Sequence, residues 1–225
     1  MSLKKNKINK KLKITFLIDK KNNWFTKYLI SFIKKKSKNI IFQIKDKIKD
    51  VKNQDVVFFI NLTNIINKKF LKKNKLNLLI HSSNLPKDRG GAPLHWQILR
   101  GKSEIKICLI EAKSKVDSGE IILQTKLKLV GNELYDELRD KQRKSIIKLI
   151  KNFIKIYPNF KKKKQIGKSS FNRLRNPDDS EININKSIKS QFNLIRVCDN
   201  KKYPLFFYYK KRKYYLKVTA EKLLV

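Results

Sequence analysis

The first 81 residues alternate between short apolar runs and stretches with helical spacing. Four of the runs are almost continuously apolar, which favours buried strands. They span 13–19, 40–44, 55–60 and 76–81. Apolar residues at helical spacing in 24–33, and a second helix expected over 65–73, lie between these runs. Continuous apolar strands that alternate with helices are typical of a parallel sheet covered on both faces, so the pattern predicts an α/β fold.

Residues 82–160 carry a more broken pattern. The segment 82–93 contains two prolines and two glycines and predicts a loop. This loop follows the fourth strand, at the carboxyl edge of the sheet where such folds bind their ligands. A short helix is expected near Trp96, and strands at 105–111 and 121–129 flank a predicted turn at Asp117.

Residues typical of helix starts and helix ends predict a long helix, which is followed by a change of domain. Asn132 is the expected N-cap because acidic residues follow it, and Tyr157-Pro158 should end the helix. After a lysine-rich linker at 161–168, aromatic residues become frequent, and a short helix followed by a β-hairpin is expected within 192–218. We therefore predict two domains, residues 1–160 and 169–225, the second one small and β-rich.

Composition allows folding and argues against several classes of protein. The chain has 225 residues, of which 40% are hydrophobic and 10% aromatic, so wholesale disorder is not expected. No apolar run approaches the roughly 20 residues that cross a bilayer, and we expect a cytoplasmic protein without a membrane span. Cys108 and Cys198 are too few for a disulfide framework or a zinc site, so buried thiols and no metal are predicted.

The net charge of +38 is extreme, with 56 Lys+Arg against 18 Asp+Glu. A basic surface favours phosphate-rich partners, because released counterions contribute affinity. However, only 8 of the 56 are arginine, and lysine is accompanied by many Ile, Asn and Phe residues, all with A/T-rich codons. Genome composition therefore explains part of the excess, and polyanion binding stays open as an alternative.

The loop after the fourth strand carries the most specific motif of the sequence. It reads His81-Ser82-Ser83-Asn84-Leu85-Pro86-Lys87-Asp88-Arg89-Gly90-Gly91-Ala92-Pro93. The run resembles the signature of the N10-formyltetrahydrofolate-dependent formyltransferases, Asn-x-His-x-Ser-Leu-Leu-Pro-x-x-Arg-Gly. A second block of that family resembles Asp117-Ser118-Gly119, which lies 36 residues after His81. Near the end, Asn193 and Arg196 resemble the C-terminal subdomain shared by methionyl-tRNA formyltransferases and sugar-nucleotide N-formyltransferases.

The resemblance implies a Rossmann-like formyltransferase domain over 1–160 that moves a formyl group from N10-formyltetrahydrofolate to a primary amine. His81 would stabilise the oxyanion or accept the amine proton, and Asp117 would orient the imidazole. The family's catalytic Asn is replaced by Leu79, and Asn77, two residues further back, is the candidate substitute if the strand bends. Otherwise an oxyanion donor would come from elsewhere, with Asn61 and Asn84 as the alternatives. The residues expected to bind the formyl donor are Leu85, Pro86, Arg89, Gly90 and Gly91.

Three readings of the function remain open, two with different acceptors for an enzyme and one without catalysis. The wording of the motifs favours a nucleotide-linked amino sugar, as in the enzymes of surface-polysaccharide biosynthesis. Methionyl-tRNA is the alternative acceptor, and the net charge favours it. A degenerate, non-catalytic RNA-binding protein of the same fold is the third reading, because Leu79 replaces the catalytic Asn. A homodimer is compatible with each of them.

Overall fold

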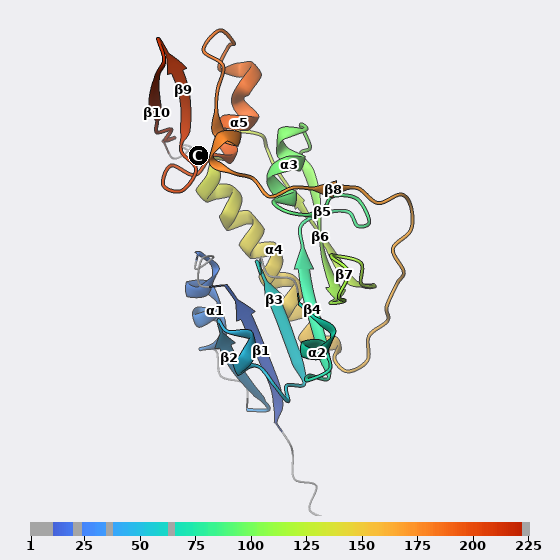
Figure 1. The fold of residues 1–225 in the computed structure, drawn as a ribbon. Helices are drawn as coiled ribbons and strands as arrows, with labels where there is room; N and C mark the ends of the chain where they lie inside the picture. The colour runs from blue at the N-terminus through green and yellow to red at the C-terminus, as the bar shows by residue number, and fades with distance from the viewer. Residues whose placement is uncertain (1–10, 20–23, 35–37, 63–65, 222–225) are drawn as a thin grey trace, which may run out of the picture. The chain divides into compact units, whose positions relative to one another are not determined.

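The computed structural model describes residues 11–19, 24–34, 38–62 and 66–221 (Figure 1). The chain forms two compact units. The first contains the chain up to Ile80 together with Ile110–Gly119, and the second contains His81–Leu109 and Glu120–Val225. This division does not coincide with the predicted domains, whose boundary lay at 161–168, so independent folding of residues 169–225 stays a prediction.

The first unit contains the four predicted strands. They are β1 (Leu12–Ile18), β2 (Ile40–Lys45), β3 (Val56–Ile60) and β4 (Leu76–His81), of which His81 itself falls in the second unit. β1 pairs in parallel with β2 and with β3, and β3 pairs in parallel with β4. Every residue of β3 is buried, which explains why its sequence is continuously apolar.

Helices and 3-10 turns lie between these strands in the described parts of the chain. Helix α1 (Thr26–Ile33) confirms the first predicted helix, and the 3-10 turn covers Ile48–Asp50. Helix α2 (Lys68–Leu71) is shorter than the predicted 65–73, because the side chain of Asn67 accepts a hydrogen bond from the Phe70 N–H at 2.8 Å and caps the helix there. Ile65, the predicted first residue, lies outside the described residues.

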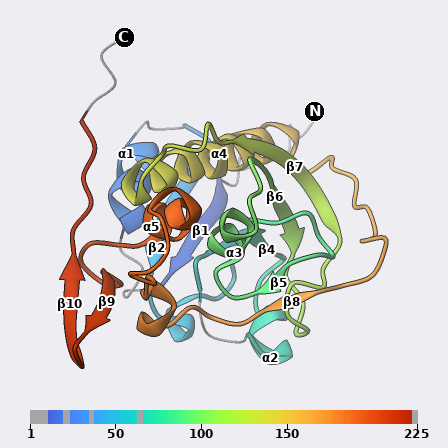
Figure 2. The same cartoon turned by 90° about the horizontal axis from the view of Figure 1, so that it is seen from above.

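The second unit begins with the loop after β4 and contains β6 (Glu104–Glu111), apart from its last two residues, and β7 (Ile121–Lys128). Within the described residues, the main sheet has the hydrogen-bonded order β2-β1-β3-β4-β6-β7. Helix α3 (Pro93–Leu99) confirms the short helix expected near Trp96, and helix α4 (Tyr135–Ile156) packs against β7 (Figure 2). The mostly parallel α/β architecture is therefore confirmed.

The predicted loop 82–93 is not entirely irregular. Arg89–Gly90 forms strand β5, which pairs in parallel with β8 (Phe171–Asn172). The sequence did not reveal this pairing, because its two partners are about 80 residues apart and each strand has only two residues. Pairing with β8 brings the segment that follows the lysine-rich linker against the loop.

The start of α4 differs from the prediction. Asn132 is not the N-cap; that position is Leu134, whose N–H donates to the Glu137 carboxylate at 2.8 Å. The Glu133 carboxylate accepts hydrogen bonds from the N–H groups of Val130 and Gly131 at 2.7 and 3.0 Å. Both carboxylates accept hydrogen bonds from backbone N–H groups near the start of the helix. The prediction that acidic residues mark this helix start was therefore correct, and the prediction that Asn132 is the N-cap was wrong.

The C-terminal part of the second unit contains the predicted helix and hairpin. A 3-10 turn at Pro177–Ser180 and another at Lys189–Gln191 precede α5 (Phe192–Val197). Strands β9 (Leu205–Tyr209) and β10 (Arg212–Leu216) form the antiparallel hairpin. Ile195, Cys198 and Leu205 form its small core. In the part of the chain that the structure describes, no helix is long and apolar enough to span a membrane, and no group of His, Cys, Asp and Glu could hold a metal.

A buried ion pair joins α5 to the chain before α4. Arg196 and Glu133 have side chains only 2% and 4% exposed, and Arg196 Nη1 lies 3.4 Å from Glu133 Oε2. Burial by itself would raise the pKa of Glu133, but the Lys141 ammonium and the N–H groups of Val130 and Gly131 outweigh it and lower this pKa to about 2. The ionised carboxylate therefore stabilises the folded state.

We expect Glu133 to make stability depend on pH in the acidic range. Its pKa is lower in the folded protein than its usual value of 4.5, so its contribution is complete above pH 4.5 and is lost as pH falls through about 2. The shift corresponds to about 3 kcal/mol of unfolding free energy. Urea denaturation from pH 7 to pH 2 should show the Glu133→Gln variant less stable at pH 7, with the difference shrinking on acidification. Parallel curves for the two proteins would contradict this assignment.

Candidate active site

His81 is the last residue of β4 and is buried. Its Nε2 lies 2.7 Å from the backbone carbonyl oxygen of Asp88. Because a carbonyl oxygen can only accept, we assign the proton in this contact to Nε2, which leaves the lone pair of the neutral imidazole on Nδ1. A histidine with one nitrogen fixed in this way has the tautomer that a general base or a hydrogen-bond donor requires.

Two buried glutamines hold the loop directly after His81. Gln97 Nε2 donates to the Ser82 carbonyl at 2.8 Å, and Gln142 Nε2 donates to Ser82 Oγ at 2.9 Å. Ser83 Oγ in turn donates to the Lys87 carbonyl at 2.7 Å. Sequence reasoning missed the glutamines, although Gln142 gave a signal. It lies on the buried stripe of α4, where a polar residue needs a partner, together with Leu138, Ile146, Leu149, Ile150 and Phe153.

Asp88 is a further residue that sequence reasoning missed. It is buried, with φ of 60°, and its Oδ1 accepts hydrogen bonds from the Arg100 guanidinium and from Asn172 Nδ2, the latter at 3.1 Å. Lys102 Nζ lies 3.5 Å from Oδ2. These three groups fix the carboxylate and with it the turn whose carbonyl contacts His81.

The two glycines of the loop are required because another segment of the protein's own backbone passes close to them. A Cβ on Gly90 would lie 2.4 Å from the Asn172 carbonyl oxygen, and one on Gly91 would lie 2.6 Å from Leu174 Cα. Gly91 N–H also donates to the Asn172 carbonyl at 2.9 Å. Close approach of the segment around β8 therefore explains both glycines, and the contact with the formyl donor predicted for them is not needed to account for their presence.

The remaining predicted donor-binding residues lie in the same loop. Leu85 and Pro86 are buried. The side chain of Arg89 is also buried, and its Nη2 donates to Gln165 Oε1 at 2.5 Å. Its Nε has no hydrogen-bond partner in the described part of the chain. The guanidinium carbon also lies 5.9 Å from the Phe171 ring centroid. A buried guanidinium whose described side-chain contacts are a neutral amide and an aromatic ring suits an anionic ligand group.

Asp117 belongs to the first unit, in the turn after β6. It is buried and adopts φ of 46°, a left-handed conformation that a non-glycine residue seldom occupies. Ser118 Oγ donates to the Lys115 carbonyl at 2.9 Å, and a Cβ on Gly119 would lie 1.6 Å from the Glu111 carbonyl oxygen. The turn is therefore tight, and this backbone conformation is one that clusters at functional sites.

The hydrogen bonds of Asn77 favour a structural role over the predicted catalytic one. Its Nδ2 donates to the Leu71 carbonyl at 2.8 Å, and Asn74 Nδ2 lies 3.5 Å from its Oδ1. Asn74 Oδ1 also accepts from the Gln54 N–H at 3.1 Å, so the amide belongs to a polar network at the start of β4. Leu79, at the family's Asn position, packs against an apolar cluster that contains Phe59 and Phe70.

His95 is structural, in line with its lack of a sequence motif. It is buried and stacks on the Tyr135 ring, with centroids 6.0 Å apart. Burial, with Arg139 and Arg175 nearby, holds the pKa of His95 well below its usual value, so this imidazole is neutral. Burial also raises the pKa of the Cys108 thiol, which is a poor nucleophile for that reason.

The sequence and fold together define the class of protein. Residues 43–154 match the formyl transferase family, and the chain belongs to that family. This confirms the resemblance seen in the loop after His81.

Individual relatives are similar over part of their length. The methionyl-tRNA formyltransferase of Malacoplasma penetrans is 32% identical over 122 residues, which cover 52% of this chain and 38% of that protein. Across the first three curated relatives, the matches span between 28% and 50% of the relative.

Two solved structures share the fold. A methionyl-tRNA formyltransferase from Clostridium thermocellum superposes with a TM-score of 0.81 at 23% identity, covering 94% of each chain. A sugar N-formyltransferase from Shewanella superposes with a TM-score of 0.71 at 14% identity, covering 94% of this chain and 99% of that one. At these identities the superpositions establish the architecture and not the acceptor.

We expect Asn77→Ala to destabilise the protein. The substitution removes the 2.8 Å hydrogen bond to the Leu71 carbonyl and the contact with Asn74 Nδ2, and the loss of a buried hydrogen bond costs about 1–3 kcal/mol. Urea denaturation should show this loss of unfolding free energy. Asn84→Ala, in the exposed part of the loop, is the matched control and should change stability little. Equal stability of the two variants would instead leave the Asn77 amide available for the catalytic role.

We expect Asp88 to set the tautomer of His81. Because the chain has only 2 histidines and His95 is neutral, 15N NMR can follow both imidazoles in one spectrum. The native protein should show His81 protonated on Nε2. Asp88→Ala removes three side-chain partners and disfavours the left-handed turn, so it should give a mixture of tautomers, while Asp88→Asn, which tolerates φ above zero, should keep more of the native one. An unchanged His81 signal in Asp88→Ala would refute this role.

Proposed function

We propose that this protein transfers a formyl group from N10-formyltetrahydrofolate to a primary amine. One observation carries the proposal: His81 ends β4 with Nε2 held by the Asp88 carbonyl, inside the loop that matches the family signature. A buried imidazole with a fixed tautomer, next to a loop with an unpartnered buried guanidinium nitrogen, combines proton transfer with binding of an anionic substrate.

In the proposed reaction the amine nitrogen attacks the formyl carbon, and the bond from that carbon to N10 of the donor breaks. The amine gives up one proton and the departing tetrahydrofolate nitrogen takes one, so protons balance. His81 can accept the amine proton at Nδ1, or donate a hydrogen bond to the oxyanion when that nitrogen is protonated. For Asp117 we propose a role in proton movement, which its left-handed backbone conformation supports.

Arg89 supports the identity of the donor. In the described part of the chain no carboxylate pairs with it, and its Nε has no partner. A folate donor carries carboxylates on its glutamate tail, and such a group would supply the missing charge partner. Leu85 and Pro86 are the buried apolar residues of the same loop that we propose contact the donor.

Two acceptors compete. The sequence comparisons favour methionyl-tRNA, because the first curated relatives all have that activity in their names. The second candidate is the nucleotide-linked amino sugar predicted from the residues of the motifs. It is supported by the fold that this chain shares with the sugar N-formyltransferase from Shewanella. Because the matched segments cover at most half of those relatives, the two are tested in parallel.

We expect His81→Ala to lower kcat by about 10²–10⁴, the usual contribution of a positioned acid or base. Asp117→Asn should also lower it strongly, and asparagine keeps the left-handed turn. Release of tetrahydrofolate is measured with methionyl-tRNA or a nucleotide-linked 4-amino sugar as acceptor. Lys87→Ala, an exposed change in the same loop, is the control and should leave kcat unchanged. Full activity of both His81→Ala and Asp117→Asn would refute the catalytic assignment, and no turnover with any amine would favour the non-catalytic RNA-binding reading.

A further inference from the structure

Ser82, the residue directly after His81, is held by one side chain from each of two helices. Gln97 of α3 donates to its carbonyl, and Gln142 of α4 donates to its Oγ. Ser82 and Gln142 are both only 5% exposed, so water does not compete for the bond between them. All these residues belong to the second unit. The backbone that carries the His81 ring is therefore fixed at its next residue, both through the main chain and through a side chain.

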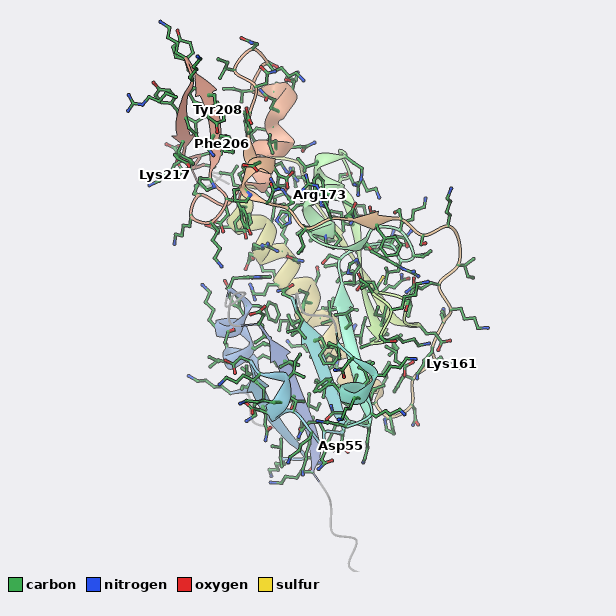
Figure 3. The ribbon with its side chains drawn as sticks, in the orientation of Figure 1. Asp55, Lys161, Arg173, Phe206, Tyr208 and Lys217 are labelled. Atoms are coloured by element: carbon green, nitrogen blue, oxygen red, sulfur yellow. The ribbon has the colours of Figure 1, made fainter. Side chains whose placement is uncertain are left out.

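The α3 contact comes from a helix that is fixed on its own. Trp96, the residue before Gln97, donates from Nε1 to the Arg173 carbonyl at 2.8 Å. The guanidinium carbon of Arg173, a residue labelled in Figure 3, lies 4.9 Å from the Trp96 ring centroid. Gln97 Nε2 also donates to the Pro93 carbonyl at 3.0 Å, within its own helix. The position of Gln97 therefore does not depend on Ser82.

The α4 contact depends on the direction of one amide. Arg139 Nη1 donates to Gln142 Oε1 at 2.9 Å. A guanidinium can only donate, so the amide oxygen must face Arg139 and the amide nitrogen must face Ser82. We assign the two amide atoms from these partners. Arg139 therefore determines which end of the Gln142 amide reaches the residue after His81.

Arg139 is itself positioned by an aromatic pair. Its guanidinium carbon lies 5.0 Å from the Tyr135 ring centroid, one turn earlier on α4. The Tyr135 ring stacks on His95 of α3 with centroids 6.0 Å apart. A cation over the face of a tyrosine ring is attracted by the ring's quadrupole. A continuous series of contacts thus leads from His95 through Tyr135, Arg139 and Gln142 to Ser82.

We propose that Gln142 is a positioning residue for His81, and that Arg139 sets the direction of its amide. Leucine would fill this place on the apolar stripe of α4 without needing partners, so the two hydrogen bonds are what glutamine adds. Neither side chain contacts the reacting atoms in this inference; both act through the backbone at Ser82. Its kinetic part rests on the proposed formyl transfer, because a displaced imidazole slows a reaction that needs it at a fixed place.

The first test compares two substitutions of Gln142. Gln142→Leu should lower kcat by about 10- to 100-fold and change KM for the donor little, since the donor-binding loop residues are untouched. Gln142→Glu should stay within a few-fold of the native kcat, because a carboxylate accepts from Arg139 and also from the Ser82 hydroxyl, which can donate as well as accept. Equal kcat values for Gln142→Leu and the native protein would overturn the proposal, as would equal losses for Gln142→Leu and Gln142→Glu.

Arg139 has a matched control on the same helix. Arg139→Gln should lower kcat, because the Gln142 amide loses the partner that sets its direction. Arg143→Gln should leave kcat unchanged, because Arg143 is one turn further along and its Nε donates to Asp140 Oδ1 at 3.0 Å. Equal effects of the two variants would contradict the role of Arg139.

A double-mutant cycle separates positioning from general weakening of the loop. Ser82→Ala removes the hydroxyl that Gln142 holds. If the two residues act as one unit, the variant that combines Ser82→Ala with Gln142→Leu loses no more activity than the worse single variant. If the two losses multiply, the residues act independently and the proposal is wrong. Thermal unfolding is measured for every variant, and kcat is compared well below the lowest Tm.

A readout without turnover separates this inference from the proposed function. In 15N NMR spectra the His81 signals should change in Gln142→Leu and stay close to native in Gln142→Glu, while those of His95 serve as the internal reference. A native protein that turns over no acceptor would count against the proposed function alone. His81 signals that are identical in the native protein and in Gln142→Leu would overturn the positioning role, whatever the activity.

Discussion

The loop that follows His81 depends on one buried carboxylate. Asp88 lies in the left-handed region and gathers Arg100, Lys102 and Asn172, while its own carbonyl contacts the imidazole. A buried carboxylate is costly unless it is paired and hydrogen-bonded, so the aspartate and its partners stabilise one another. The partner of the candidate catalytic histidine is therefore positioned by side chains outside the turn, from the end of α3 and from β8.

Much of the fold could be predicted because the sheet imposes a strong pattern. β1, β3 and β4 were recognised as apolar runs, since parallel strands buried on both faces leave little room for polar residues. β2 was recognised in the same way, although it is an edge strand whose residues are partly buried or exposed. The predicted starts of the helices were less accurate, because single hydrogen bonds set them. The Asn67 side chain begins α2 and the Glu137 carboxylate caps α4, and each depends on one local choice among several polar residues.

The candidate site was predicted in part, for a physical reason. His81 and Asp117 stand out because their neighbours in the sequence form motifs. Asp88, Gln97 and Gln142 do not, because their partners lie far away in the chain and only the folded structure brings them together. The glycines show the same limit: their position was predicted, but the backbone that approaches them comes from residues 172–174.

The pairing of β5 with β8 has a consequence for the lysine-rich linker. Lys161 to Lys164 are exposed, although the backbone of Lys163 is hydrogen-bonded in both directions to Ile121. A trypsin-like protease would therefore find its cleavage sites in the linker on either side of Lys163. The segment beyond that point is tied to the preceding chain by backbone hydrogen bonds from Arg89 to Ser170 and from Gly91 to Asn172, and by the buried pair of Glu133 and Arg196. A nicked molecule would accordingly remain assembled, and two separately made fragments would have the contacts that fragment complementation requires.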